Sequence, residues 1–229
     1  MLIAYFCAEF AIKDGIPYAG GLGILAGDYI LEAAEQNFPI VGIGLHYQKK
    51  QNGQPSRAHL NLVKKSLFKK LIIEIPIEDR AVLAQVWQWK KKNTSVYFLD
   101  TNIPENNESD RIITEQLYVE DRDMRLKQEL ILGIGGVRLL RALKLKPDLY
   151  HLNEGHSAFL CLEITDKSKV VFTNHTLVLE GQEMFAFDAL TRMTKKLCAE
   201  LKLNILDIIE KGKSKPTDTL FSMTTLALN

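Results

Sequence analysis

Short apolar runs alternate with longer amphipathic segments at both ends of the 229-residue chain. Strands are predicted at residues 2–7, 40–45, 149–152 and 169–173. Helices are predicted at residues 22–37, 123–145, 157–164, 186–201 and 205–211. Because strands and helices alternate, the pattern predicts an α/β fold built on a parallel sheet.

The middle of the chain has a different pattern. Residues 71–76, 82–89 and 94–99 are β-rich runs separated by short polar breaks, which predicts a meander of hairpins. A polar loop is expected at residues 100–111. The expected fold is therefore a Rossmann-like parallel sheet flanked by helices, with a β meander inserted at about residues 65–100. One domain is expected to cover residues 1–229.

Glycines interrupt the longest predicted helix at Gly133, Gly135 and Gly136. In a helix each glycine costs roughly 1 kcal/mol relative to alanine. Three together predict that another backbone packs very close to the helix at this point. The charged loop before the helix predicts a cap at Asp121 or Asp123.

Composition and charge narrow the function classes. Hydrophobic residues make up 46% and charged residues 25%, as in an ordinary globular protein. A net charge of +1 predicts no basic face, so no nucleic-acid partner is expected. No apolar run approaches the ~20 residues of a membrane helix, so no membrane partner is expected. The scattered Cys7, Cys161 and Cys198 predict neither a disulfide framework nor a metal site, and they fit a reducing, cytoplasmic location.

A glycine-rich segment precedes the first predicted helix. Gly21, Gly23 and Ala26 match the spacing of a dinucleotide fingerprint. However, the glycines do not directly follow the first strand, and the second strand ends in His46-Tyr47, where a ribose-binding acid is needed. Glycine N–H groups that open a helix can still bind an anion. A tight turn that requires positive φ is an equally good interpretation.

Polar segments follow two further predicted strands. Residues 151–156 read H-L-N-E-G-H, and residues 173–176 read T-N-H-T. Taken singly, each is as consistent with structural hydrogen bonding as with catalysis. Because the carboxyl ends of parallel strands meet at one edge of a sheet, we expect both segments and the glycine loop to converge on one site.

Together these segments resemble the glycogen/starch (α-glucan) phosphorylase family, in its shorter bacterial and archaeal branch. The similar segments are residues 5–10, the G-G-L-G-I-L-A-G-D run at 20–28, the helix region 124–138, the H-L-N-E-G-H-S-A-F run at 151–159 and residues 172–176. They occur in the family's order and span nearly the whole chain. The resemblance implies the N-terminal half of a GT-B glycosyltransferase.

The resemblance also implies an activity and a phosphate site. Family members transfer a terminal α-1,4-linked glucose from a glucan to phosphate and release glucose 1-phosphate. The glycine loop of the family binds the phosphate, which corresponds to Gly20, Gly21 and Leu22 here. Glu9 is implied to lie close to the same catalytic centre.

The sugar site is implied by the other segments. The histidine of the N-H-T segment contacts glucose through its carbonyl in the family, which corresponds to His175. Asn153 and His156 are implied to support that contact. The acidic loop before the long helix is implied to line the sugar pocket, with Asp121 as the nearest match.

The family's cofactor is pyridoxal phosphate, and the resemblance implies that its lysine belongs to a second, C-terminal domain, which is expected to be absent from this chain. The chain alone is therefore expected to be inactive. The expected partners are an α-1,4-glucan, phosphate and a C-terminal phosphorylase domain on a separate chain. Self-association is also expected, because removal of the second domain would expose an apolar face.

One segment departs from the family's pattern. Residues 177–183 lack the prolines and the second histidine of H-T-P-V-x-A-G-H-D, and Glu180 adds a charge. This departure favours one alternative, a non-catalytic glucan-binding remnant. The other alternative is a GT-B enzyme like the starch or glycogen synthases, but these carry a lysine just before the glycines, where this chain has Tyr18-Ala19.

Overall fold

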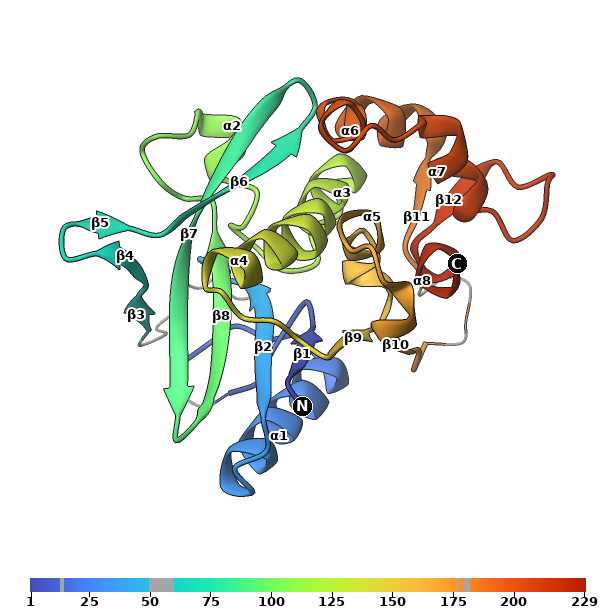
Figure 1. The fold of residues 1–229 in the computed structure, drawn as a ribbon. Coiled ribbons are helices and arrows are strands. Elements are labelled where there is room, and N and C mark those ends of the chain that lie inside the picture. The colour runs from blue at the N-terminus through green and yellow to red at the C-terminus, as the bar shows by residue number, and fades with distance from the viewer. Residues whose placement is uncertain (13–14, 50–59, 177, 179–181) are drawn as a thin grey trace.

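The computed structural model describes residues 1–12, 15–49, 60–176, 178 and 182–229 (Figure 1). Its centre is a sheet with the strand order β10-β9-β1-β2-β8-β7-β3, in which β6 also pairs with β7. The strands of this sheet are β1 (Ile3–Phe6), β2 (Ile40–Leu45), β3 (Asn61–Leu62), β6 (Ile72–Ile77), β7 (Arg80–Lys91), β8 (Thr94–Asp100), β9 (Leu149–Asn153) and β10 (Val170–Thr173).

The five strands β10, β9, β1, β2 and β8 are parallel, which confirms the predicted α/β architecture. The predicted meander is also present, because β7 runs antiparallel to both β6 and β8. It extends the central sheet directly, since Val41 on β2 pairs in parallel with Ser95 on β8. The meander is thus continuous with the parallel strands that carry the polar segments.

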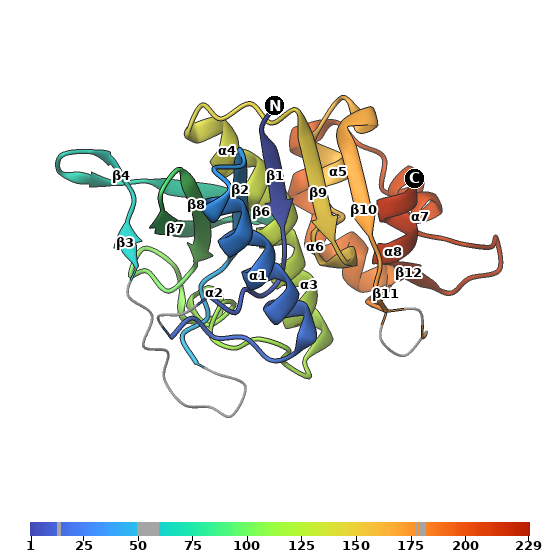
Figure 2. The same cartoon turned by 90° about the horizontal axis from the view of Figure 1, so that it is seen from below.

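Helices cover both faces of the sheet. In Figure 2 α1 lies in front of β1 and β2, whereas α3, α4 and α6 lie behind the sheet. The two faces bury separate apolar clusters, and successive residues of β1 point into different ones. Tyr5 packs with Ala26 and Ile30 of α1, whereas Phe6 belongs to the larger cluster on the opposite face. The helices are α1 (Gly21–Glu35), α2 (Glu108–Arg111), α3 (Arg122–Leu130), α4 (Gly136–Ala142), α5 (Leu160–Glu163), α6 (Phe187–Leu201), α7 (Ile205–Lys211) and α8 (Met223–Leu228).

The glycine-interrupted helix runs from α3 to α4 through a π-helical stretch, Ile131–Gly135. A Cβ atom at Gly133 would lie 2.8 Å from the backbone nitrogen of Leu160 and 2.9 Å from the carbonyl oxygen of Ser157. The predicted close approach of another backbone is therefore confirmed. Asp121 caps the helix start by accepting a hydrogen bond from the backbone nitrogen of Met124 at 3.0 Å.

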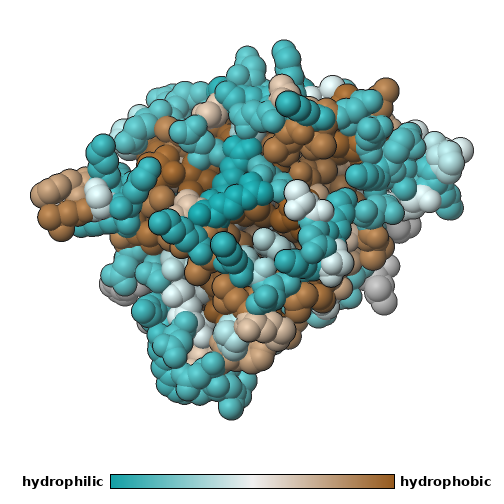
Figure 3. All heavy atoms as spheres, in the orientation of Figure 1, coloured by the Kyte–Doolittle hydropathy of each residue, from teal (hydrophilic) through white to brown (hydrophobic). Residues whose placement is uncertain are grey.

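Several short elements carry no periodic signal and were not predicted. They include α2, the antiparallel pair β4 (Lys64–Ser66) and β5 (Lys69–Lys70), and the antiparallel pair β11 (Met184–Ala186) and β12 (Leu220–Ser222). The predicted helix at 157–164 is shorter than expected, because a 3-10 turn, Gly155–Ser157, precedes α5. The turn between β4 and β5 exposes Leu67 and Phe68, and Figure 3 shows it as an apolar tip at the left edge.

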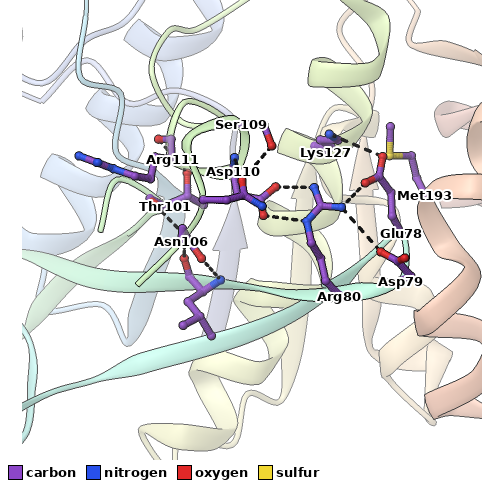
Figure 4. Close-up of polar contacts among 12 residues, drawn as sticks. Glu78, Asp79, Arg80, Thr101, Asn106, Ser109, Asp110, Arg111, Lys127 and Met193 are labelled. Carbon is purple, nitrogen blue, oxygen red and sulfur yellow. Dashed lines mark hydrogen bonds and ion pairs between the residues drawn. The ribbon is translucent and has the colours of Figure 1, made fainter. Parts of the chain in front are cut away.

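A network of charged side chains ties the β6–β7 turn to the helices (Figure 4). Arg80 donates two hydrogen bonds to the buried carboxylate of Asp110, at 2.8 and 2.6 Å, and also pairs with Glu78. Glu78 in turn lies 3.0 Å from Arg192 of α6 and 3.7 Å from Lys127 of α3. Because the charges of this cluster are mutually paired, its role is structural. In the described part of the chain, no helix is long and apolar enough to cross a membrane.

Candidate functional site

A cavity of about 600 Å³ opens beside the carboxyl ends of β9 and β10 and the start of α1. The strand order reverses at β1, because β2 lies on one side of it and β9 on the other. Open α/β sheets bind ligands at the carboxyl ends of the strands where the order reverses in this way. The residues lining the cavity are Gly21, Leu22, Leu25, Tyr118, Glu154, Gly155, His156, His175, Thr176, Gln182, Glu183 and Thr224. The three polar segments therefore converge as predicted.

The glycine loop presents the start of α1 to this cavity. Gly20 is the N-cap residue, with an extended backbone and no side-chain cap, and Gly21 is the first helical residue. The first backbone N–H groups of a helix have no partner within the helix, and they carry the positive end of its dipole. Gly21 and Leu22 line the cavity, so this end of α1 can receive an anion.

Glu9 holds the glycine loop from behind. Its Oε2 accepts hydrogen bonds from the backbone nitrogens of Ala19, at 2.6 Å, and Gly20, at 3.3 Å. Its Oε1 accepts from the hydroxyl group of Tyr118 at 2.9 Å. Burial and the neighbouring Glu9 carboxylate raise the pKa of Tyr118 well above its usual range, so the phenol stays a donor. The N–H of Gly20 is thus engaged by Glu9, and Gly20 is not among the cavity-lining residues.

Asn153 fixes the ring of His175. Its Nδ2 donates to Sγ of Cys7 at 3.3 Å, and its Oδ1 lies 3.1 Å from Nε2 of His175. Because Oδ1 is an acceptor only, Nε2 of His175 carries the proton and donates. Burial raises the pKa of Cys7 to about 12, so its thiol stays neutral.

Glu154 orders the backbone that follows β10. Its Oε1 accepts hydrogen bonds from the backbone nitrogens of His175, at 2.7 Å, and Thr176, at 3.0 Å. The hydroxyl group of Thr176 donates to the same oxygen at 3.2 Å. Glu154 itself has φ 68° and ψ 175°, a conformation that is strained for a residue with a side chain. Backbone strain of this kind often marks a functional site.

Ionisable side chains form and back another part of the cavity wall. His156 lies with its Nδ1 3.8 Å from Oε1 of the buried Glu129. Glu183 pairs with Arg125 and lies 3.1 Å from Arg122. The ligand atoms of Glu129, His156 and Glu183 lie within 4.8 Å of one another, so this is the group of described residues that could approach a metal ion.

The structure thus brings most of the predicted site residues together. Gly21, Leu22, His156 and His175 line the cavity. Glu9 and Asn153 form hydrogen bonds with lining residues, and Gly20 adjoins Gly21. Asp121 is exposed, caps α3 and is not among the cavity-lining residues. Its predicted contact with the sugar stays a prediction.

Sequence reasoning missed several cavity residues. Glu154 belonged to a singled-out segment, and its strained backbone was not visible in the sequence. Tyr118 gave no signal of its own, because it precedes α3 in the chain and only the fold brings it to the cavity wall. The predicted effect of Glu180 lies outside the described residues, whereas Gln182 and Glu183 of the same unusual segment line the cavity.

Comparison with solved structures identifies the class of fold. The catalytic domain of starch synthase IV from Arabidopsis thaliana, bound to ADP and acarbose, superposes with a TM-score of 0.70 at 16% sequence identity. The superposition covers 99% of this chain and 43% of the synthase chain. The fold is therefore that of a GT-B glycosyltransferase domain.

The sequence relatives define the family. Maltodextrin phosphorylase of Thermococcus litoralis is 34% identical over 260 residues, which cover 99% of this chain and 31% of that protein. Glycogen phosphorylase of Mycobacterium tuberculosis is 34% identical, over 83% of this chain and 27% of that protein. Glycogen phosphorylase of Aquifex aeolicus is 37% identical, over 70% of this chain and 26% of that protein. No family model matches the chain. The resemblance to the α-glucan phosphorylases is confirmed: the chain is homologous to part of these enzymes, and it spans less than a third of their length.

Proposed function

We propose that this chain is the N-terminal, glucan-facing domain of an α-glucan phosphorylase, which supplies half of the site where glucose is transferred from a glucan to phosphate. The observation that carries the proposal is a single cavity lined by the start of α1, His156 and His175. An anion-binding helix end and neutral sugar-binding groups in one cavity are what such a transfer requires.

The start of α1 is the proposed phosphate site. Glu9 already occupies the N–H of Gly20, so the donors left for phosphate are the backbone N–H groups of Gly21 and Leu22. These donors are fixed by the helix and need no reorganisation when charge develops during transfer. Glu9 acts by holding the loop in place, since its carboxylate accepts hydrogen bonds from the backbone nitrogens of Ala19 and Gly20.

The strand ends form the proposed glucose site. The backbone of His175 is held by Glu154 and its ring by Asn153, so its carbonyl group has a defined position. A carbonyl oxygen can accept a hydrogen bond from a sugar hydroxyl group without gaining charge. His156 completes this wall from the turn after β9.

Pyridoxal phosphate does not fit the described residues that line this cavity. A covalently held aldehyde cofactor needs a lysine, and no lysine is among the residues that line the cavity. We assign that cofactor, together with the basic groups that close the phosphate site, to a second domain. The chain alone is therefore expected to bind phosphate weakly and to form no glucose 1-phosphate.

The phosphate site is tested by removing one donor. Gly21 is the first residue of α1, a position where proline is well tolerated, and the extended backbone of Gly20 suits the residue before a proline. Gly21→Pro deletes the N–H, whereas Gly21→Ala keeps it, and a Cβ at this position meets no atom within 4 Å. We expect phosphate to shift the amide resonance of Leu22 in the wild type and in Gly21→Ala. In Gly21→Pro, phosphate should bind about tenfold more weakly, because a charge-assisted hydrogen bond contributes about 1.5–3 kcal/mol.

Other outcomes would contradict the proposal. Equal phosphate affinity in Gly21→Pro and Gly21→Ala would remove the start of α1 from the site. Saturable binding of ADP in preference to phosphate would favour the synthase-like alternative. Glucose 1-phosphate formation by the purified chain from maltoheptaose and phosphate would show that no second domain is needed.

A further inference from the structure

A buried ionisable pair lies directly behind the cavity. The side chain of His156 is 12% exposed, and it lines both the large cavity and a small one of about 10 Å³ beside Glu129. Glu129, on α3, is 3% exposed, and the contact from its Oε1 to Nδ1 of His156 is 3.8 Å. His156 is therefore part of the wall that separates Glu129 from the proposed ligand site.

The carboxyl group of Glu129 is without a hydrogen bond in the described part of the chain, although both oxygens are buried. An unpaired buried carboxylate carries a large desolvation cost. Burial raises the pKa of Glu129 to about 7, and His156 opposes this shift. Glu183 and Arg125 also face Glu129, but they form an ion pair with each other. Tyr47 lies nearby, and burial raises its pKa far above the usual range. His156 is thus the side chain placed to satisfy Glu129.

We propose that Glu129 is a positioning residue for His156, and that the protons held by this pair decide whether Nε2 of His156 accepts or donates a hydrogen bond toward the cavity. The part that concerns a bound ligand rests on the function proposed above. The contact must shorten by about 1 Å to become a hydrogen bond, and hydrogen bonds at active sites often tighten in this way when substrate binds.

The switch follows from counting protons. With one proton on the pair, the proton lies on Nδ1 and bonds to ionised Glu129, so Nε2 is an acceptor. When a second proton binds, either the imidazole is charged or Glu129 is protonated and donates to Nδ1. In both cases Nε2 carries a hydrogen and becomes a donor. An acceptor suits a sugar hydroxyl group, whereas a donor suits a phosphate oxygen.

A metal ion is the competing use of the same residues. Glu129, His156 and Glu183 are close enough to approach one cation. However, Glu183 is already paired with Arg125 and Arg122, and a cation would have to displace a guanidinium group. The geometry therefore favours a proton over a metal.

The test is nitrogen NMR of ¹⁵N-histidine-labelled protein between pH 5 and 9, with His156→Asn to assign the resonances. At high pH the wild type should show Nδ1 of His156 protonated and Nε2 unprotonated, and acidification should protonate Nε2. Glu129→Gln keeps an acceptor and should retain the Nδ1–H form while losing the coupled titration step. Glu129→Leu should lose the Nδ1–H preference. The signals of His46, His151 and His175 report whether each variant is folded.

Specific results would overturn the proposal. These are an Nε2–H form at high pH in the wild type, an unchanged His156 titration in folded Glu129→Gln, or stoichiometric Zn²⁺ binding that shifts the His156 signals. Phosphate and maltoheptaose should move the wild-type titration midpoint and leave that of Glu129→Gln in place. If the histidine results hold and neither ligand binds, the pair stands and the proposed function fails.

Discussion

The carboxylate of Glu154 holds the backbone of His175, because its Oε1 accepts a hydrogen bond from the His175 amide nitrogen at 2.7 Å. The two residues come from the ends of neighbouring parallel strands, β9 and β10. A side chain at one strand end therefore shapes the loop at the next. Because Glu154 has a strained backbone, the arrangement is maintained against a local conformational cost.

Substitution of Glu154 should release this loop. Glu154→Ala removes the acceptor of the His175 and Thr176 amides, so both should lose protection from hydrogen exchange. Glu154→Gly removes the same acceptor and also relieves the strain at φ 68°, so it should be about 1 kcal/mol more stable than Glu154→Ala. Amide exchange by NMR and urea unfolding measure the two effects. Retained protection in both variants would show that Glu154 does not order the loop.

Glu129 should make stability depend on pH. Its pKa is raised to about 7 by burial, from an ordinary value of 4.5, so the folded chain binds more protons than the unfolded chain between these values. The free energy of unfolding should therefore fall as pH rises from about 4.5 to about 7, by about 3 kcal/mol for this group. Glu129→Gln stays neutral, so its free energy of unfolding should rise relative to that of the wild type as pH increases over that range. Urea unfolding at pH 5 and pH 8 measures the difference, and the exposed Glu105→Gln is the control. Parallel pH profiles of Glu129→Gln and the wild type would contradict this assignment.

Arg80 should stabilise the fold through Asp110. The Asp110 side chain is 3% exposed, so removal of Arg80 leaves a buried carboxylate without its main partner. Because Arg80 is itself 30% exposed, Arg80→Met should cost about 2–3 kcal/mol, less than the loss of a fully buried partner. Asp79 lies 3.9 Å from Arg80 with a side chain that is 79% exposed, so Asp79→Asn should have little effect. In chemical unfolding, the double variant Arg80→Met with Asp110→Asn should recover part of the stability that Arg80→Met loses. If no stability is recovered, the Arg80–Asp110 pair does not stabilise the fold as proposed.

Gly133 should tolerate no side chain. A Cβ there would lie 2.8 Å from the backbone nitrogen of Leu160, and backbone atoms cannot move aside as a flexible side chain can. Gly133→Ala should therefore destabilise the chain by about 1–3 kcal/mol, despite the better helix propensity of alanine. Gly21→Ala meets no atom within 4 Å and should leave the unfolding midpoint nearly unchanged. A more stable Gly133→Ala would show that the two helices can separate at little cost.

Much of the fold could be predicted from local patterns. The strands near residues 3–6, 40–45 and 149–153 and the long helix follow from apolar periodicity, which is a property of neighbouring residues. The short pairs β4–β5 and β11–β12 could not be predicted, because strands of two or three residues have no measurable period. The direct parallel pairing of β2 with β8 was also out of reach, since it joins strands separated by about 50 residues.

The order of strands and polar segments along the chain was enough to predict which segments meet at the site. Residues 151–156 and 173–176 directly follow buried parallel strands, whose carboxyl ends lie at the same sheet edge, so their convergence could be predicted. The glycine loop joins them in the cavity at the start of α1. The close packing at Gly133 was also fixed locally, because only glycine allows a backbone to approach so near.

Which atom of each segment is available for chemistry depends on the folded chain. Glu9 takes the N–H of Gly20, and Asn153 sets the ring of His175. Glu129 is brought behind His156 from 27 positions away in the chain. Hydrogen-bond partners and the protonation of buried groups depend on distance and desolvation in the folded chain, and a linear sequence records neither.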